Sequence, residues 1–150
     1  MTLLEALLAA AVLAMAATAI IMPFSAGAAA SAQEARSTLA VSVAQDLMEE
    51  ILSQPFSDAN GEAGETGRTN WDDMLDYRAY VEAPGALRCR DGSFITDAAS
   101  TGMGRIATVE AFDPDGAGPC TAAEFLRVTV RINYRGQDIL ALSRIVYKNQ

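Results

Sequence analysis

Residues 1–33, MTLLEALLAAAVLAMAATAIIMPFSAGAAASAQ, decide the fold of this chain. Glu5 is their only formal charge, and the run from Ala6 to Gln33 carries none. An α-helix of that run would rise about 42 Å, which exceeds the roughly 30 Å hydrocarbon core of a bilayer. The stretch therefore predicts a helix that can span a membrane, and the simplest interpretation is a single-span anchor.

Glu5 needs a partner, because an unpaired carboxylate at membrane depth costs about 2.5 kcal/mol or more. Thr2 and Glu5 match the T-x-x-E capping box, in which the carboxylate also meets the positive end of the helix dipole. The alternative partner is the α-amine of Met1, in the same chain or in a neighbouring one, where the pair would fix the register between adjacent helices. The apolar run begins without a preceding Lys or Arg, which predicts that a basic leader has been removed.

The sequence M-T-L-L-E, followed by an uninterrupted apolar helix, resembles the mature N-terminus of type IV pilins and of the related type II secretion pseudopilins. In that family a dedicated peptidase cuts before the first residue, the new amine is usually methylated, and the helices pack in the core of a filament. The resemblance implies cleavage and methylation at Met1 and gives Glu5 the role of the family's acidic residue. Phe is commoner than Met at the first position, so the chain departs mildly from the pattern.

Pro23 lies inside the apolar run, and a proline in a helix removes a backbone hydrogen bond and clashes with the preceding turn. We predict a kink or a melted segment there, with Gly27 lowering the local helix propensity by about 1 kcal/mol. A bent membrane helix would account for the pattern. In pilin filaments a comparable proline region often loses its helical hydrogen bonds, so the resemblance keeps extended backbone around Pro23 as an alternative.

The second part of the predicted helix, residues 34–53, is amphipathic, with apolar residues at three- and four-residue spacing. Its acidic residues, including Glu50, lie off this stripe. The stripe predicts a face that packs under a sheet, and Pro55 with the glycines after it predicts a helix end near Ser53. The stripe consists of Ala40, Val43, Ala44, Leu47, Met48, Ile51 and Leu52.

Residues 54–150 are predicted to form a small antiparallel β head. In the clearest strand, apolar and polar residues alternate from Leu126 to Tyr134, so that one face is core and the other is solvated. A tight Arg-Gly-Gln connection at residues 135–137 predicts a hairpin. Together with a strand near Tyr77, about four strands would pack on the amphipathic helix, which gives an α+β fold of unspecified strand order. The three later strands are predicted at 105–112, 124–134 and 138–147.

The stretch from Thr69 to Gly85, TNWDDMLDYRAYVEAPG, predicts a short capped turn followed by a strand. Thr69 or Asn70 is the expected cap, and the strand pattern is the alternation of Tyr77, Ala79 and Val81. The turn also contains an acidic group that could gather around calcium, although no complete loop motif is present and a solvated turn is the alternative. The acidic residues are Asp72, Asp73 and Asp76.

Cys89 and Cys120 flank the segment before the last hairpin. In an exported domain they are expected to form a disulfide worth roughly 3 to 4 kcal/mol, the alternative being two free buried thiols. Between them, Asp113 and Asp115 belong to a D-x-D-G fragment that resembles part of a calcium loop, and major pseudopilins carry calcium in their heads. A Pro-Gly turn is the alternative, because the fragment lacks the later acidic ligand.

Composition argues against several classes of function. The net charge of −8 and the pI near 4.4 provide no basic stripe for nucleic-acid phosphates. The sequence contains no His, which excludes His-based catalytic triads and imidazole metal sites. We therefore expect no catalysis and no resident cofactor, apart from the calcium alternative above.

Taken with the resemblance, these features predict a structural subunit of a type IV pilus-like filament. Its expected partners are further copies of the chain, a prepilin peptidase and the pilus or secretion assembly machinery. Before assembly the chain would lie in the cytoplasmic membrane with its head outside the cytoplasm, and afterwards in a filament at the cell surface. The alternatives are a minor pilin or secretion pseudopilin, a membrane-anchored binding module and, least supported, an anchored enzyme.

Overall fold

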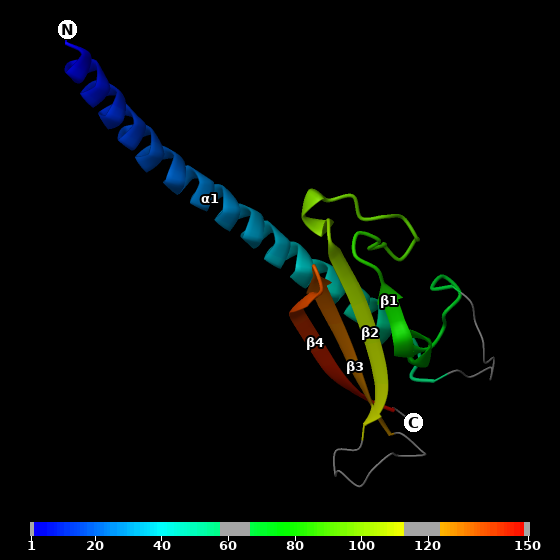
Figure 1. The fold of residues 1–150 in the computed structure, drawn as a ribbon. Coiled ribbons are helices and arrows are strands. Elements are labelled where there is room, and N and C mark those ends of the chain that lie inside the picture. Colours follow the sequence, from blue (N-terminus) through cyan, green and yellow to red (C-terminus); the bar gives the residue numbers. More distant parts are fainter. Residues whose placement is uncertain (1, 58–66, 113–123, 149–150) are drawn as a thin grey trace. The chain divides into compact units, whose positions relative to one another are not determined.

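The computed structural model describes residues 2–57, 67–112 and 124–148 (Figure 1). It has the predicted α+β fold, in which a 50-residue helix is followed by a four-stranded antiparallel sheet. The chain divides into two units, Met1–Arg36 and Ser37–Gln150, and the helix contributes to both. The elements in chain order are α1 (Leu3–Leu52), η1 (Met74–Ala79), β1 (Tyr80–Glu82), η2 (Ala98–Ser100), β2 (Met103–Phe112), β3 (Phe125–Tyr134) and β4 (Gln137–Tyr147).

The helix α1 is continuous through Pro23. The extended backbone that remained an alternative at this position is therefore not found. A proline removes only its own N–H from the helical ladder, and the surrounding alanines, which have the highest helix propensity, favour helix on both sides. The bend predicted at Pro23 stays a prediction. The helix ends at Leu52, next to the predicted end at Ser53.

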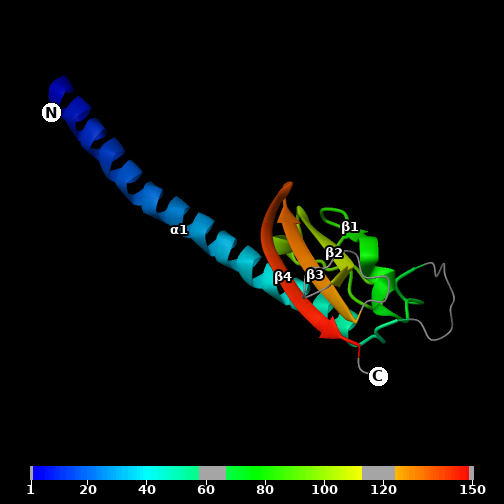
Figure 2. The same cartoon turned by 90° about the horizontal axis from the view of Figure 1, so that it is seen from below.

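The sheet has the strand order β1-β2-β3-β4, and every neighbouring pair is antiparallel (Figure 2). This meander supplies the order that the sequence left open, and the three later strands lie within two residues of their predicted bounds. The hairpin between β3 and β4 is confirmed: Arg135 and Gly136 both have positive φ, 51° and 83°. A two-residue loop of this kind matches the twist of the flanking strands, and glycine accepts it without strain.

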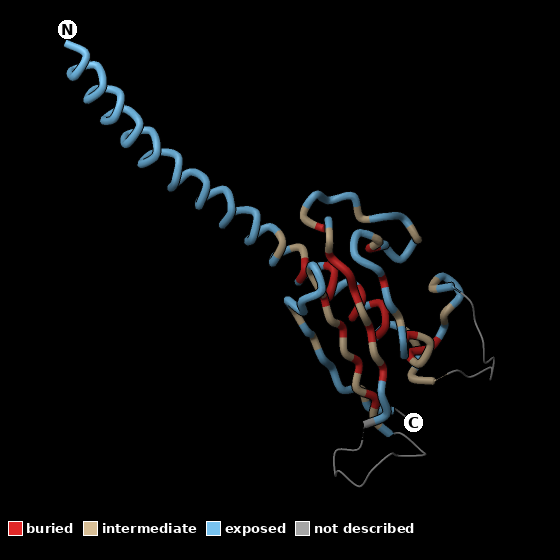
Figure 3. The backbone as a smooth tube through the Cα atoms, in the orientation of Figure 1, coloured by how far each residue is buried: buried red, intermediate tan, exposed pale blue. Residues whose placement is uncertain are grey.

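The core lies between one face of the sheet and residues 37–52 of α1. The predicted stripe is buried with one exception, since Leu52 at the helix end is 36% exposed. In Figure 3 the buried positions gather on the strands and on this part of the helix. The strands contribute Met103, Ala107, Val109, Leu126, Val128, Val130 and Ile132, all at most 1% exposed.

The segment before β1 differs from its prediction. Of the residues expected to alternate as a strand, Tyr77 and Ala79 lie in the 3-10 helix η1, and only Val81 lies in a strand, the three-residue β1. The cap is Asp73 rather than Thr69 or Asn70: its Oδ1 accepts the N–H groups of Leu75 and Asp76 at 2.6 and 3.0 Å. The Asp76 side chain bonds back to the Asp73 N–H, which completes a capping box. This local closure outweighs the strand pattern.

Candidate functional site

The first candidate site is the surface of α1 before residue 36. Every described residue from Thr2 to Ala35 is exposed, and this run is uniformly pale blue in Figure 3. Its exposed side chains include Leu3 at 83% and Phe24 at 76%. An 18-residue window of α1 has a mean hydropathy of 2.3 and no buried residue. By length and composition the helix can cross a membrane, which indicates membrane association or secretion.

Glu5 lies at the start of this surface and closes a capping box with Thr2, as the sequence predicted. The Thr2 N–H donates to Glu5 Oε2, and the Glu5 N–H donates to Thr2 Oγ1, each at 3.4 Å. Both distances are longer than those of strong hydrogen bonds. The carboxylate thus keeps acceptor capacity for a second donor. Its other predicted partner, the amine of Met1, lies outside the described residues.

Two hydroxyl groups inside the apolar run, those of Thr18 and Ser25, bond to their own helix. Thr18 Oγ1 donates to the carbonyl of Met15 at 2.9 Å and lies 3.2 Å from that of Ala14. Ser25 Oγ donates to the carbonyl of Met22 at 2.9 Å. Unbonded hydroxyls are costly in an apolar environment. Because these two are bonded internally, they are compatible with lipid or with the apolar surface of other helices.

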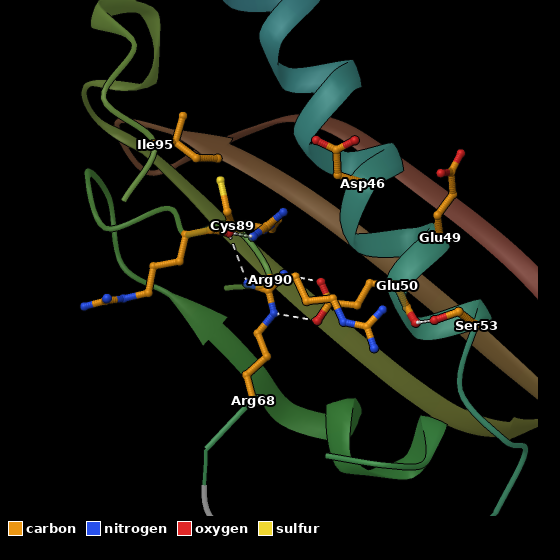
Figure 4. Close-up of a pocket in the computed structure, with 10 residues that line it drawn as sticks. Asp46, Glu49, Glu50, Ser53, Arg68, Cys89, Arg90 and Ile95 are labelled. Carbon is orange, nitrogen blue, oxygen red and sulfur yellow. Dashed lines mark hydrogen bonds and ion pairs between the residues drawn. The ribbon is translucent and has the colours of Figure 1, made fainter. Parts of the chain in front are cut away.

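The second candidate site is a buried network of four charged side chains in the unit Ser37–Gln150. Arg68 Nε donates to Glu50 Oε1 at 2.7 Å, and a second, shorter contact joins the Arg68 Nη2 and Glu50 Oε2 atoms. Arg68 Nη1 also lies 3.1 Å from Glu82 Oε1, and Arg105 Nε lies 2.7 Å from Glu82 Oε2. The network ties α1, the segment before η1, β1 and β2 together, with two positive and two negative charges. Figure 4 shows Arg68 against Glu50.

Backbone carbonyl groups accept further hydrogen bonds from the two arginines. Arg105, 1% exposed, donates through Nη1 to the carbonyl of Val43 and through Nη2 to that of Arg88, both at 2.7 Å. Arg68 Nη1 lies 3.1 Å from the same Arg88 carbonyl. Buried ion pairs are tolerated only when their remaining donors and acceptors are bonded. In this network each arginine has both a carboxylate and a backbone carbonyl as partners, and the bond from Arg105 to Val43 joins the sheet to the helix.

Two tyrosines bond to the acids of the network. Tyr77 Oη donates to Glu50 Oε1 at 2.7 Å, and Tyr80 Oη donates to Glu82 Oε1 at 2.5 Å. Burial and the bond to Glu82 raise the pKa of Tyr80 to about 12. Burial alone would raise the pKa of Glu50, but the hydrogen bonds from Arg68 and Tyr77 and the charge of Arg68 outweigh it and hold that pKa below its ordinary value. Glu50 is therefore ionised at neutral pH.

A cavity of about 390 Å³ lies beside the network (Figure 4). Its walls carry both signs of charge, and its arginines Arg68 and Arg105 are already engaged within the protein. In the described ranges no group of three or more Cys, Asp or Glu side chains is placed to hold a metal ion. The geometry of this region therefore indicates that the charge network stabilises the fold of the head, and it does not indicate a particular ligand or reaction. The wall residues include Asp46, Glu49, Arg88, Cys89, Arg90 and Ile95.

Several predicted site residues cannot be compared with the structure. Cys120 and the calcium candidates Asp113 and Asp115 lie outside the described residues. Cys89 is exposed and forms no disulfide with any described residue, so the disulfide with Cys120 stays a prediction. The alternative of two buried thiols is wrong for Cys89. In the earlier acidic group, Asp73 and Asp76 are engaged in capping η1.

Sequence reasoning missed the charge network. It placed Glu50 off the buried stripe, yet Glu50 is 7% exposed. A signal was present in β2. Arg105 is an even number of residues from the buried Met103, Ala107 and Val109, so its side chain is on the same face of the strand. An arginine on the core face of a strand needs buried acceptors. That argument could have identified Arg105 and called for acidic partners.

The architecture is pilin-like: a long apolar N-terminal helix is followed by a four-stranded antiparallel sheet. Comparison of the chain with protein-family models, with curated proteins and with solved structures finds no match in any of the three.

Proposed function

We propose that this chain is a structural subunit of a type IV pilus-like filament, in which the exposed apolar part of α1 packs against the same part of other copies. One observation carries the proposal. Every described residue from Thr2 to Ala35 is exposed, and from Thr2 to Gln33 the only formally charged side chain is that of Glu5. An apolar surface of this extent is not stable in water and needs lipid or other helices around it.

Assembly would proceed by exchange of environment. Before assembly the apolar run lies in the cytoplasmic membrane with the head outside the cytoplasm, after a prepilin peptidase has exposed the amine of Met1. During assembly, lipid contacts are replaced by helix contacts, and Glu5 accepts the amine of a neighbouring Met1. The internally bonded hydroxyls of Thr18 and Ser25 make both environments acceptable. The assembled filament lies at the cell surface.

The chain in this proposal has no catalytic role and no resident cofactor. Its work is assembly through the pilus or secretion machinery, and the head, held to the helix by the charge network, forms the outer surface of the filament. A minor pilin or a secretion pseudopilin shares the same helix but is present in few copies or in a short fibre. The stoichiometry of isolated filaments separates these alternatives.

The test compares two ways of opening the capping box. Glu5→Ala removes the carboxylate, whereas Thr2→Ala removes its local partner and leaves the carboxylate available. Loss of one member of a buried ion pair costs about 3 to 5 kcal/mol, so we expect Glu5→Ala to reduce the yield of sheared filaments by a factor of about 100 or more. Loss of a cap costs only about 1 kcal/mol, so Thr2→Ala should change the yield much less.

Glu34→Ala is the matched control, because Glu34 is an exposed carboxylate of the same helix. It should leave the filament yield unchanged. Electron cryo-microscopy of the filaments would show whether this chain repeats as the subunit. Normal filaments from Glu5→Ala, or equal losses from Thr2→Ala and Glu5→Ala, would contradict the assembly role of Glu5. Sheared filaments built from another chain would favour the minor pilin or pseudopilin alternative.

A further inference from the structure

The loop between β1 and β2 contains a tight turn, which a bridge between Arg88 and Phe94 closes. Inside the bridge, the Cys89 N–H donates to the carbonyl of Ser93 at 2.8 Å, and the Gly92 N–H donates to the carbonyl of Cys89 at 3.0 Å. Gly92 has a φ of 84°, and a Cβ there would meet no atom within 4 Å beyond its neighbours in the chain. The backbone conformation of the turn therefore requires glycine at this position.

This requirement places a glycine directly after Asp91, and aspartate followed by glycine is the pair most prone to isomerise. In the reaction, the Gly92 nitrogen attacks Cγ of the protonated Asp91 carboxyl group, and water leaves as a succinimide ring closes. A second water molecule then opens the ring at the main-chain carbonyl of Asp91. The chain now continues through Cγ, and the former α-carboxyl group is the side chain. The conversion is redox-neutral and needs no reagent other than water.

The turn restrains both reacting groups. Ser93 donates to Asp91 Oδ1 through its N–H at 2.9 Å and through Oγ at 2.6 Å. These bonds, that of the hydroxyl above all, hold the pKa of Asp91 below its ordinary value, so its carboxyl group is ionised at neutral pH. An ionised carboxylate has no hydroxyl group that can leave as water. The attacking nitrogen of Gly92 is restrained as well, because its N–H is bonded within the turn.

We propose that the peptide bond between Asp91 and Gly92 is a slow modification site, which converts to the β-linked form, and that Ser93 is the residue that restrains it. Conversion requires the turn to open, because Gly92 must leave the Cys89 carbonyl and Asp91 must leave Ser93. Asp91 and Ser93 are exposed, so local opening does not require the head to unfold. The proposal does not depend on the filament.

Arg88 connects this turn to the charge network. Its Nη1 donates to the carbonyl of Gly92 at 2.8 Å. Its own carbonyl accepts Arg68 Nη1 at 3.1 Å and Arg105 Nη2 at 2.7 Å. The β-linked form adds a methylene group to the main chain inside the turn and moves the carboxylate that the turn binds. We therefore expect conversion to weaken the network and to lower the stability of the head.

Incubation of the full chain in detergent at neutral pH tests the site. After reduction, cleavage following glutamate releases residues 83–110 as one peptide, which contains both Asp91 and Asp97. Asp97 is a matched internal control: it also accepts the N–H two residues ahead, that of Ala99 at 2.7 Å, but alanine follows it. Electron-transfer fragmentation should find the β-linkage accumulating at Asp91 and not at Asp97. In urea the conversion should be at least about tenfold faster, because the bonds of the turn are lost.

Variants test the role of Ser93. Ser93→Ala removes the hydroxyl donor and keeps the N–H, so it should speed conversion about two- to tenfold. Ser93→Thr keeps a hydroxyl group and should convert at the parent rate. Asp91→Glu keeps the charge, but its longer side chain would have to close a six-membered ring, so it should not convert in the same time. Circular dichroism shows whether the head of each variant is folded.

The urea midpoint of the converted chain should be lower than that of the fresh chain, whereas Asp91→Glu should keep its midpoint through the same incubation. No conversion at Asp91, equal conversion at Asp91 and Asp97, or equal rates in the folded chain and in urea would overturn the proposal. A Ser93→Ala variant that converts at the parent rate would overturn the role of Ser93. An unchanged midpoint after conversion would overturn the connection to the charge network.

Discussion

The two parts of α1 differ in where their partners are. Residues 37–52 carry a buried stripe that the sheet covers, including Leu47 and Ile51, both 0% exposed. The described residues before position 36 are all exposed, although they are more apolar. A periodic stripe indicates a partner within the same chain, because only one face needs cover. A helix that is apolar on all sides needs an apolar environment all around it, such as lipid or other helices, and the described part of this chain does not provide one.

The continuity of α1 shows that helix formation does not depend on this cover. Alanine and leucine dominate the exposed part, and both have high helix propensity. The capping box at Thr2 and Glu5 satisfies donors at the first turn. The difference between the two parts is therefore one of packing, and variants can test it from the strongest contact to the weakest.

The largest effect is expected where the sheet holds the packed part of the helix. Arg105→Leu removes the bond to the carbonyl of Val43 in α1 and leaves Glu82 with one cationic partner fewer. We expect the free energy of unfolding of the head to fall by about 3 to 5 kcal/mol. Urea unfolding in detergent, followed by the fluorescence of the single tryptophan Trp71, measures it.

Arg131→Leu provides the control for this variant. Its guanidinium lies 3.9 Å from the Asp138 carboxylate, and both side chains are well exposed. Surface pairs contribute at most about 1 kcal/mol, so its effect should be small. Similar losses from Arg105→Leu and Arg131→Leu would show that the buried network does not hold the helix to the sheet.

The next prediction makes the same substitution in the two parts of the helix. Leu47→Ala leaves a cavity at a position that is 0% exposed and should lower the free energy of unfolding of the head by about 2 to 5 kcal/mol. Leu13→Ala, at a position 75% exposed, should leave that value unchanged within about 0.5 kcal/mol. The same urea titration reports both. A loss of head stability in Leu13→Ala would mean that the apolar part also supports the head.

The smallest expected effect is the pH dependence of the free energy of unfolding that is due to Glu50. Because the pKa of Glu50 is lowered in the folded protein, its charge stabilises the fold above its ordinary pKa of 4.5, and this contribution is lost as the pH falls through the lower folded value. Glu50→Gln should therefore be less stable than the parent near neutral pH, with the difference shrinking below about pH 4. Urea midpoints between pH 7 and 3 measure this difference. For the exposed control Glu34→Gln, the difference in midpoint from the parent should stay constant over this pH range. A constant difference for Glu50→Gln would contradict this role of the carboxylate.

Periodicity in the sequence was enough to predict the fold. The apolar run, the stripe that ends near Ser53 and the alternation along β3 each depend on neighbouring residues, and each is confirmed. The Glu5 capping box was predictable for the same reason, since its members lie three residues apart. The strand predicted at Tyr77 was wrong because a cap at Asp73 favoured η1.

The charge network could not be predicted in this way. Glu50 bonds to Arg68 and Tyr77, which lie 18 and 27 residues away in the sequence. The residues next to Glu50 in the sequence therefore do not indicate that its carboxylate has buried hydrogen-bond partners. A carboxylate is assigned to solvent unless its distant partners are known. Arg105 lies two residues from both Met103 and Ala107, so its position in β2 indicates the core face of the strand. This local sign is useful only once it is known which face of the strand is buried.

The internal bonds of Thr18 and Ser25 have a consequence for reversibility. These two hydroxyl groups need no new hydrogen bond when lipid around the helix is exchanged for protein. The two surroundings then differ mainly in packing and in the partner available to Glu5. In the proposed filament, a small energy difference between the two surroundings would let an external source of work decide the direction in which the helix is transferred.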